Sequence, residues 1–157
     1  MTNKIIVGVD GSDGGRRALH WAMQEAAETG KHLEAVTAWH WAGVQDMVPA
    51  VAGPDEQRRV AEAGQARDIA TVRAEVGASV PVSRVLVEGV AAEVLTGAAR
   101  GAHLLVLGSH GHGRLHHAVL GSVTEECVRH AGCPVVVVPV PHGKPFATAG
   151  EAVTTTA

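Results

Sequence analysis

Glycines spaced along one short stretch are the residues of this sequence that most favour binding chemistry. They follow the apolar run Leu104–Leu107, Ser122 comes directly after the last of them, and they are Gly108, Gly111 and Gly121. Glycine lets a backbone bend sharply and be approached closely. The four residues SVTE that begin at Ser122 have the form of a capping box, which predicts a helix start. Because a helix N-terminus favours an anion, strand, glycine loop and helix start together predict a phosphate site.

A second group of polar residues follows the first apolar run of the chain. Residues 4–9, reading KIIVGV, predict a strand that ends at the turn signal Asp10-Gly11-Ser12. A carboxylate at such a strand end accepts hydrogen bonds from ribose hydroxyls in dinucleotide-binding folds. The alternative for Asp10 is a simple turn or helix start, and the alternative for the glycines is a tight loop. We favour binding, because two distant polar turns both follow strands.

Charged and titratable side chains accompany the predicted phosphate site. Glu125 closes the capping box, and its carboxylate would repel phosphates unless it turns outward or acts through a bound Mg²⁺. Arg114 and four histidines are either solvated loop residues or groups that shield phosphate charge, more strongly below about pH 6.5. The spacing of the histidines fits no zinc pattern, so no metal site is expected. These histidines are His110, His112, His116 and His117.

Strand and helix patterns alternate along the rest of the chain. Further strands are predicted at 33–39, 82–87, 103–107 and 134–138. Helices are predicted from Ser12 or Asp13 to Gly30, over 56–76, around 91–99 and over 122–131. The second helix carries an apolar stripe, formed by Val60, Ala63, Ala66 or Ile69, and Ala70. This alternation predicts an α/β fold, with a parallel sheet covered by helices on both faces.

The predicted topology offers a place for the two polar turns to meet. In open parallel sheets, ligands bind beyond the carboxyl ends of the strands, where the strand order reverses. If the first and fourth strands are neighbours, the turn at Asp10 and the loop from Gly108 to Ser122 face one crevice.

Composition limits the class of protein. The 157 residues are 46% apolar and 18% charged, which is typical of a single globular domain. A formal charge of −3 without a dense block of Lys or Arg argues against nucleic acid or acidic lipid as a partner.

No apolar run approaches the roughly 20 residues of a membrane span, and no signal peptide precedes the first strand. Cys127 and Cys133 form no CxxC pair or disulfide framework and are expected to be core thiols. These features predict a cytoplasmic protein with a domain over 1–141 and a disordered tail over 142–157.

Several segments, in order, resemble one known family. Gly108-x2-Gly111-x9-Gly121-Ser122 resembles, without a gap, the nucleotide-binding signature of the ATP-binding branch of the universal stress protein family. The opening IIVGVDGSDGGRRALHWA, the middle segment EGVAAEVL and the final segment GSVTEECVRHAGCPVVVVP are similar to corresponding parts of that family. The resemblance covers residues 4–140, apart from the loop at 40–54.

The resemblance implies a fold, a ligand and a partner. The fold is a doubly wound open sheet of five parallel strands in the order 3-2-1-4-5, with helices on both faces (adenine nucleotide alpha hydrolase-like). The partner is a second copy of the chain, paired through the last strand at Pro134–Val138, an apolar edge that needs cover. The ligand is ATP, with or without Mg²⁺, and Asp10 matches its ribose contact. The other matched positions are Gly8 and Val9 for adenosine, Ala38 for adenine, and Gly108, Gly111, Gly121, Ser122, Val123 and Thr124 for phosphate, with Arg114 added from the loop.

The sequence favours binding over catalysis. It shows no Walker-type lysine and no base placed for the γ-phosphate, so at most slow ATP hydrolysis is expected and no catalytic residue is assigned. We interpret the chain as an ATP-binding, nucleotide-responsive regulatory homodimer for stress tolerance. The alternatives are a phosphoryl- or adenylyl-transfer enzyme on the same fold and a nucleotide-free dimerisation module. ADP, AMP and cyclic AMP stay open beside ATP.

Overall fold

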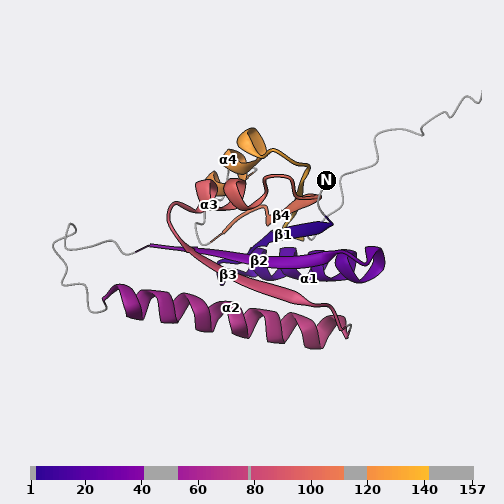
Figure 1. The fold of residues 1–157 in the computed structure, drawn as a ribbon, viewed down its shortest axis with the longest axis horizontal. Helices are drawn as coiled ribbons and strands as arrows, with labels where there is room; N and C mark the ends of the chain where they lie inside the picture. The colour runs from indigo at the N-terminus through magenta and orange to yellow at the C-terminus, as the bar shows by residue number, and fades with distance from the viewer. Residues whose placement is uncertain (1–2, 41–52, 78, 112–119, 142–157) are drawn as a thin grey trace, which may run out of the picture.

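The computed structural model describes residues 3–40, 53–77, 79–111 and 120–141, and the predicted tail at 142–157 lies outside them. Within these residues the elements alternate regularly (Figure 1). Their order is β1 (Lys4–Gly8), α1 (Asp13–Thr29), β2 (His32–Trp39), α2 (Pro54–Val76), β3 (Val82–Glu88), α3 (Ala91–Ala98), β4 (Leu104–Gly108), α4 (Ser122–His130) and β5 (Val135–Val138). The predicted strands and helices are confirmed, with ends that differ by a few residues at most.

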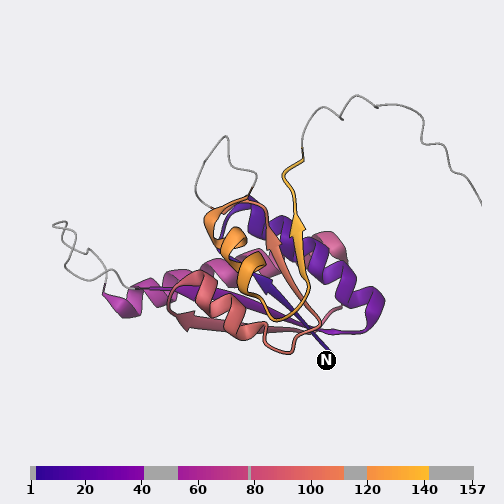
Figure 2. The same cartoon turned by 90° about the horizontal axis from the view of Figure 1, so that it is seen from above.

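The strands form one parallel sheet in the order β3-β2-β1-β4-β5. β1 is central, where Ile5 is paired with Leu33 of β2 and with Leu104 of β4. Seen from above, β5 lies at the outer edge beside β4 (Figure 2). The strand order that the family resemblance implied is therefore confirmed, and the first and fourth strands are neighbours.

Each face of the sheet is covered by its own pair of helices (Figure 1). Ile5 and Val7 of β1 pack with α1 and α2, whereas Ile6 between them packs with α3 and α4. Successive side chains of a strand point to opposite faces, so a strand buried on both faces is apolar at every position. The continuous apolar run of β1 is the sequence signature of this double-sided burial.

Local capping signals fix the bounds of α1. Ser12 is the N-cap, and its hydroxyl accepts a hydrogen bond of 3.0 Å from the N–H of Gly15. Gly30 ends the helix with φ +66°, in the left-handed region that glycine adopts without strain. Both bounds follow the predicted ones.

The predicted apolar stripe of α2 is confirmed at Ile69, which is buried, and is wrong at its other positions. Residues 53–60 are all exposed, Val60 to 62%, and Ala63 and Ala70 are exposed too. Because the helix is in contact with the sheet only along its later turns, the spacing of apolar residues in its first turns has nothing to pack against. The buried residues are Gln65, Asp68, Ile69 and Val72, of which only Ile69 belongs to the predicted stripe.

The two cysteines are free and differ in environment. Cys127 of α4 is fully buried in the core of the α3–α4 face, as predicted. Burial, reinforced by the negative charge of Glu126, raises the pKa of the Cys127 thiol to about 11, so the thiol stays protonated at neutral pH. Cys133 is only half-buried, so the prediction of a core thiol holds there in part.

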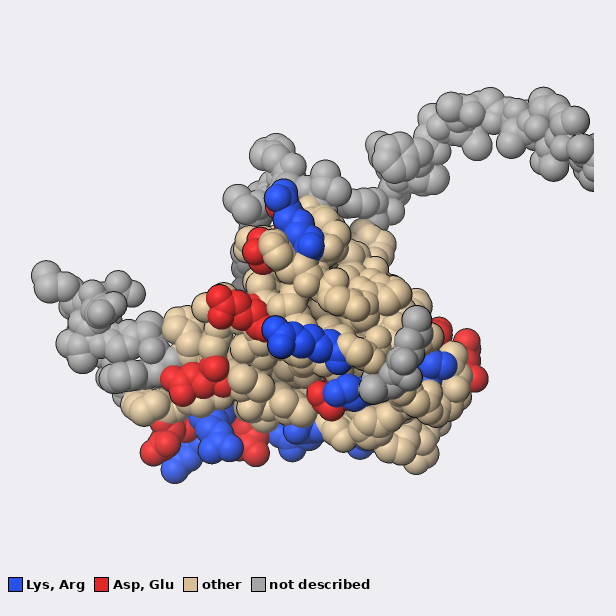
Figure 3. All heavy atoms as spheres, turned by 45° about the horizontal axis from the view of Figure 1, so that its top comes forward, with Lys and Arg blue, Asp and Glu red and all other residues tan. Residues whose placement is uncertain are grey.

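The surface carries charges of both signs. On the face drawn in Figure 3, acidic and basic side chains are interspersed and do not gather into one basic field. No helix among the described residues has the length and apolar character needed to cross a bilayer.

Candidate functional site

A cavity of about 330 Å³ lies beyond the carboxyl ends of β1 and β4. At this point the strand order reverses, because β2 and β3 lie on one side of β1 and β4 and β5 lie on the other. Open α/β sheets place ligands at this switch point, and the volume lies at the small end of the range of ligand pockets.

The structure brings nearly all the predicted site residues to this one cavity. Arg114 lies outside the described residues, as do His112, His116 and His117. The predicted residues that line the cavity are Gly8, Val9, Asp10, Ala38, Gly108, Gly111, Gly121, Ser122, Val123 and Thr124. Two segments more than a hundred residues apart in sequence therefore converge on one space.

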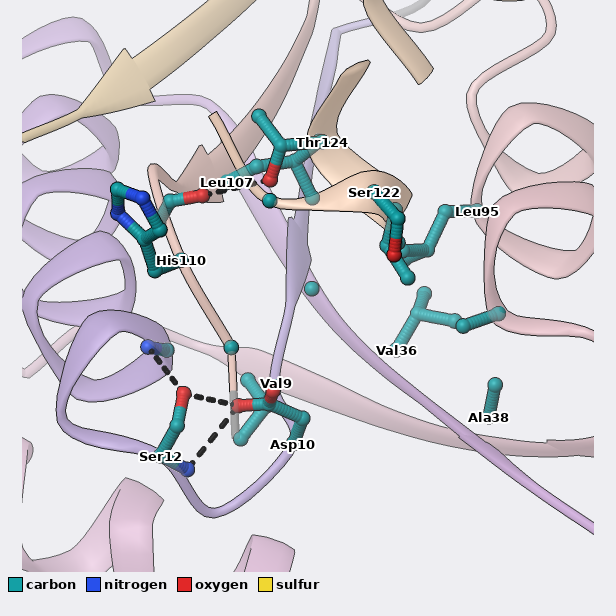
Figure 4. A pocket seen from close by; sticks show the side chains of 17 residues that line it. Val9, Asp10, Ser12, Val36, Ala38, Leu95, Leu107, His110, Ser122 and Thr124 are labelled. Atoms are coloured by element: carbon teal, nitrogen blue, oxygen red, sulfur yellow. Dashed lines mark hydrogen bonds between the residues drawn. The ribbon is translucent and has the colours of Figure 1, made fainter. Parts of the chain in front are cut away.

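One side of the cavity is apolar and the other polar (Figure 4). Val36, Ala38 and Leu95 lie together on the apolar side, at the β2 and α3 walls, whereas Asp10 and Ser12 lie on the opposite side. Sequence reasoning missed several lining residues, which are Ser12, Gly15, Val36, Ala91, Leu95, Leu107 and His110. His110 had been considered only within the histidine group, and the apolar ones carry no signal that separates a cavity wall from the core.

Asp10 is held in place by the turn that it begins. Its Oδ1 accepts hydrogen bonds from the backbone N–H of Ser12, at 3.0 Å, and from the Ser12 hydroxyl (Figure 4). The other oxygen lies beside the glycine loop, because a Cβ built on Gly111 would stand 2.7 Å from Asp10 Oδ2. The carboxylate thus has a defined orientation at the junction of the two segments.

The glycine loop joins β4 to α4 through short backbone contacts. The N–H of Gly121 donates to the carbonyl of Ser109 at 2.7 Å, and the Thr124 hydroxyl donates to the carbonyl of Gly108 at 2.8 Å. Thr124 is buried. The first turn of α4 is thereby fastened to the end of β4, on the cavity wall.

The predicted capping box at Ser122 is wrong. Gly121 is the N-cap, its carbonyl accepts from the N–H of Glu125 at 2.9 Å, and among the described residues no side chain caps the helix. Ser122 is therefore the first helical residue, as in the predicted range 122–131, and is not the cap. Glu125 is exposed and forms an ion pair of 2.7 Å with Arg129, which confirms the outward alternative.

The absence of a side-chain cap gives α4 a donor-rich start. The N–H groups of the first helical residues have no intrahelical acceptor, and the peptide dipoles add positive potential at that end. Ser122, Val123 and Thr124 belong to this first turn and line the cavity. The geometry is suited to an anionic group.

Titratable side chains add little to the described part of the site. His110 lines the cavity, with its Nδ1 3.1 Å from the Ser109 hydroxyl. Among the described lining residues there is no lysine or arginine. Over the described ranges, no three His, Cys, Asp or Glu side chains come together as metal ligands. The polar chemistry of these residues therefore comes from backbone donors, the Asp10 carboxylate, hydroxyl groups and the His110 imidazole.

Comparison with known proteins decides the family. The model of the universal stress protein family matches residues 1–139. The chain belongs to the universal stress protein family. Universal stress protein Rv2005c of Mycobacterium tuberculosis is 37% identical over 133 residues, which cover 85% of this chain and 44% of that protein. The chain thus spans less than half the length of this curated relative.

Solved universal stress proteins share the fold. One, solved in complex with cAMP, is 24% identical with a TM-score of 0.66, over 86% of this chain and 95% of that one. Another, from Archaeoglobus fulgidus in complex with dAMP, is 22% identical with a TM-score of 0.59, over 85% of this chain and 95% of that one. At these identities the likeness shows the five-stranded fold.

Proposed function

We propose that this universal stress protein binds an adenine nucleotide, in the manner of the ATP-binding branch of the family. The observation that carries the proposal is that Asp10 and the helix start at Gly121 line one cavity, with an apolar wall beside them. A nucleotide has the matching sequence of parts: an apolar base, a ribose with hydroxyl donors and an anionic phosphate. Few other common ligands combine these three parts in that size.

Each part of the nucleotide is assigned to a group of residues. The adenine packs between Val36, Ala38 and Leu95, and the ribose hydroxyls donate to Asp10. The phosphates accept from the N–H groups at the start of α4, where the N-cap Gly121 has no side chain to occupy them. Where Mg²⁺ is present, phosphate oxygens and water coordinate it at the polar end of the cavity.

The relatives support an adenylate in general. Two proteins with this fold were solved with cAMP and with dAMP. The glycine signature favours ATP, because it resembles that of the ATP-binding branch. The proposed activity is binding with at most slow hydrolysis, since Asp10 is engaged with Ser12 and the described lining residues include no lysine. In this proposal the protein acts as a nucleotide-responsive regulator in stress tolerance. Its cytoplasmic location stays a prediction.

Calorimetric titration with ATP, ADP, AMP and cyclic AMP tests the proposal. We expect wild-type protein to bind at least ATP, and Asp10→Asn to bind it about tenfold more weakly, because a hydrogen bond to a charged group is worth about 1.5 kcal/mol or more. Asp55→Asn, an exposed carboxylate in the first turn of α2, is the matched control and should leave affinity unchanged. Absence of binding heat with all four nucleotides would refute the proposal.

We infer a homodimer paired through β5. This strand lies at the sheet edge, and its four valines are all only half-buried. The carbonyls of Pro134 and Val138 accept hydrogen bonds from the N–H groups of Leu105 in β4 and of Ser109, the residue after β4. Alternation along the strand therefore points the N–H of Val137 away from β4, toward the edge that a second copy would pair with.

Sedimentation velocity of the full chain checks the dimer. We expect a dimer for wild-type protein and a shift toward monomer for Val137→Pro, which removes one edge donor while leaving the bonds to β4 intact. The circular dichroism spectrum controls for folding of the variant. A wild-type protein that stays monomeric at high micromolar concentration would contradict the inference.

A further inference from the structure

The bend that carries Asp10 is fastened from the face of the sheet opposite the cavity. Val9, the residue before Asp10, donates its N–H to the carbonyl of Val36 at 3.0 Å. Its carbonyl accepts a hydrogen bond of 2.8 Å from the hydroxyl of Thr37. Both backbone polar groups of Val9 are thus held by β2, and the direction in which the chain leaves β1 is fixed.

Thr37 reaches Val9 without lining the cavity. It stands between Val36 and Ala38, which line the cavity, and strand alternation turns its side chain to the other face. There it is buried, with only 7% of its surface exposed. Because Val9 is buried as well, water cannot readily replace the Thr37 hydroxyl as partner of the Val9 carbonyl.

Gln65 of α2 directs the Thr37 hydroxyl. Its side chain is 2% exposed, and its Nε2 lies 3.0 Å from Thr37 Oγ1, 3.0 Å from the carbonyl of Ala35 and 3.1 Å from that of Val85. Arg84 Nε donates to Gln65 Oε1 at 3.3 Å, so the amide nitrogen is the group left to donate. With Gln65 donating to Thr37, the Thr37 proton is directed to Val9.

A second connection reaches the far side of the bend and is weaker. Arg16 Nη1 donates to the carbonyl of Gly11 at 3.0 Å and lies 3.4 Å from Oδ1 of Asp68. Arg16 is partly exposed, and the other oxygen of the buried Asp68 has no hydrogen-bond partner among the described residues. Solvent screening weakens such a pair, so the path through Thr37 is the stronger of the two.

We propose that Thr37 and Gln65 are positioning residues, which set the orientation of the Asp10 carboxylate and thereby the recognition of the ribose. The role in ribose recognition rests on the proposed function. Neither side chain touches the cavity, and α2 contributes no lining residue to it. Loss of the Thr37 hydroxyl frees the Val9 carbonyl, and Asp10 then leaves its place against Ser12 and Gly111.

The test compares two substitutions of Thr37. Thr37→Val keeps the shape of the side chain and removes the hydroxyl, whereas Thr37→Ser keeps the hydroxyl. Calorimetric titration with ATP and with 2′,3′-dideoxy-ATP gives a ratio of dissociation constants that reports the ribose contact. For wild type and Thr37→Ser we expect ATP to bind about tenfold more tightly than the dideoxy compound, and for Thr37→Val we expect this preference to fall at least about threefold.

Controls separate positioning from general destabilisation. Ile69→Val, on the same helix as Gln65 and buried in the core, should keep the wild-type ratio. Gln65→Met should lower the ratio as Thr37→Val does. Thr37→Ala replaces Thr37→Val if the latter does not fold. If Thr37→Val weakens both nucleotides equally and leaves the ratio unchanged, the proposal is overturned.

A ligand-free measurement keeps the proposal distinct from nucleotide binding. The N–H of Ser12 donates to Asp10 Oδ1, so its hydrogen-exchange rate reports the orientation of the carboxylate. We expect faster exchange of this amide in Thr37→Val and a wild-type rate in Thr37→Ser. If wild type binds neither nucleotide, the proposed function fails, and an unchanged exchange rate in Thr37→Val overturns the positioning role on its own.

Discussion

Gly108→Ala should lower the free energy of unfolding by about 3 kcal/mol, the upper part of the range for overpacked sites. A Cβ on Gly108 would stand 2.6 Å from both the carbonyl carbon and the oxygen of Gly14. These are backbone atoms at the start of α1, and they cannot move aside as the end of a flexible side chain can. A Cβ on Gly14 would in turn collide with the carbonyl of His110. The end of β4 and the start of α1 therefore pass each other backbone against backbone.

Urea denaturation followed by circular dichroism measures the effect, with Gly97→Ala as the matched control. Gly97 lies within α3, and a Cβ there would meet no atom within 4 Å. Alanine is the better helix former, so the control should gain about 0.5 to 1 kcal/mol of stability. Substitution by alanine is thus expected to lower the free energy of unfolding at Gly108 and to raise it at Gly97. If Gly108→Ala unfolds at the wild-type urea concentration, the close approach of β4 and α1 does not exist.

The sequence predicted the glycine signature as a pattern, but it did not show why glycine is needed at each position. Gly108 and Gly111 are required within the protein, since their Cβ atoms would meet Gly14 and the Asp10 carboxylate. At Gly121 a Cβ would make only contacts of 3.4 Å or longer. The tight-loop alternative therefore applies to the first two glycines, whatever they contribute to a ligand. A sequence shows that a residue is small, but it does not show which neighbouring atoms leave no room for a larger one.

Elements that are encoded locally were predicted well. Ser12 and Gly30 bound α1 through their own backbone and side-chain preferences, and the runs KIIVGV and PVVVV predicted the strands at 4–9 and 134–138, close to β1 and β5. The strand order came from the resemblance to a family, because periodicity does not say which strands are neighbours. Apart from Ile69, the buried residues of α2 were mispredicted for the same reason: Gln65 is buried by partners on β2 and β3 that lie far away in the sequence.

The site was predictable where polar residues follow strands. Asp10 and Ser122 were identified because helix starts and turns at strand ends carry recognisable chemistry. Val36 and Leu95 were missed, because an apolar residue on a cavity wall has the same sequence signature as one in the core. Thr37 and Gln65 were missed as well, since a hydrogen bond across the sheet depends on tertiary contacts alone.

Ala38→Leu should weaken the binding of ATP at least about 100-fold, which corresponds to about 2.7 kcal/mol. Ala38 lies on the apolar wall of the cavity, on the same side as Val36 and Leu95 (Figure 4). The added carbon atoms of leucine enter the space assigned to the adenine ring. The expected loss exceeds that of Asp10→Asn, since exclusion of the base removes its whole buried surface and not one hydrogen bond.

A graded series distinguishes occlusion of the base site from misfolding. Ala38→Val fills less of the cavity than leucine, so its affinity should lie between those of the wild type and Ala38→Leu. Neither substitution should lower the urea midpoint much, because the new side chain enters an existing cavity and displaces no packed atom. Ala63→Leu, on the exposed side of α2, is the matched control and should leave ATP binding unchanged. If ATP binds Ala38→Leu as tightly as wild type, the base lies elsewhere. Asp10 and the start of α4 would then bind the polar and anionic parts of a ligand, and the apolar half of the cavity would hold no base.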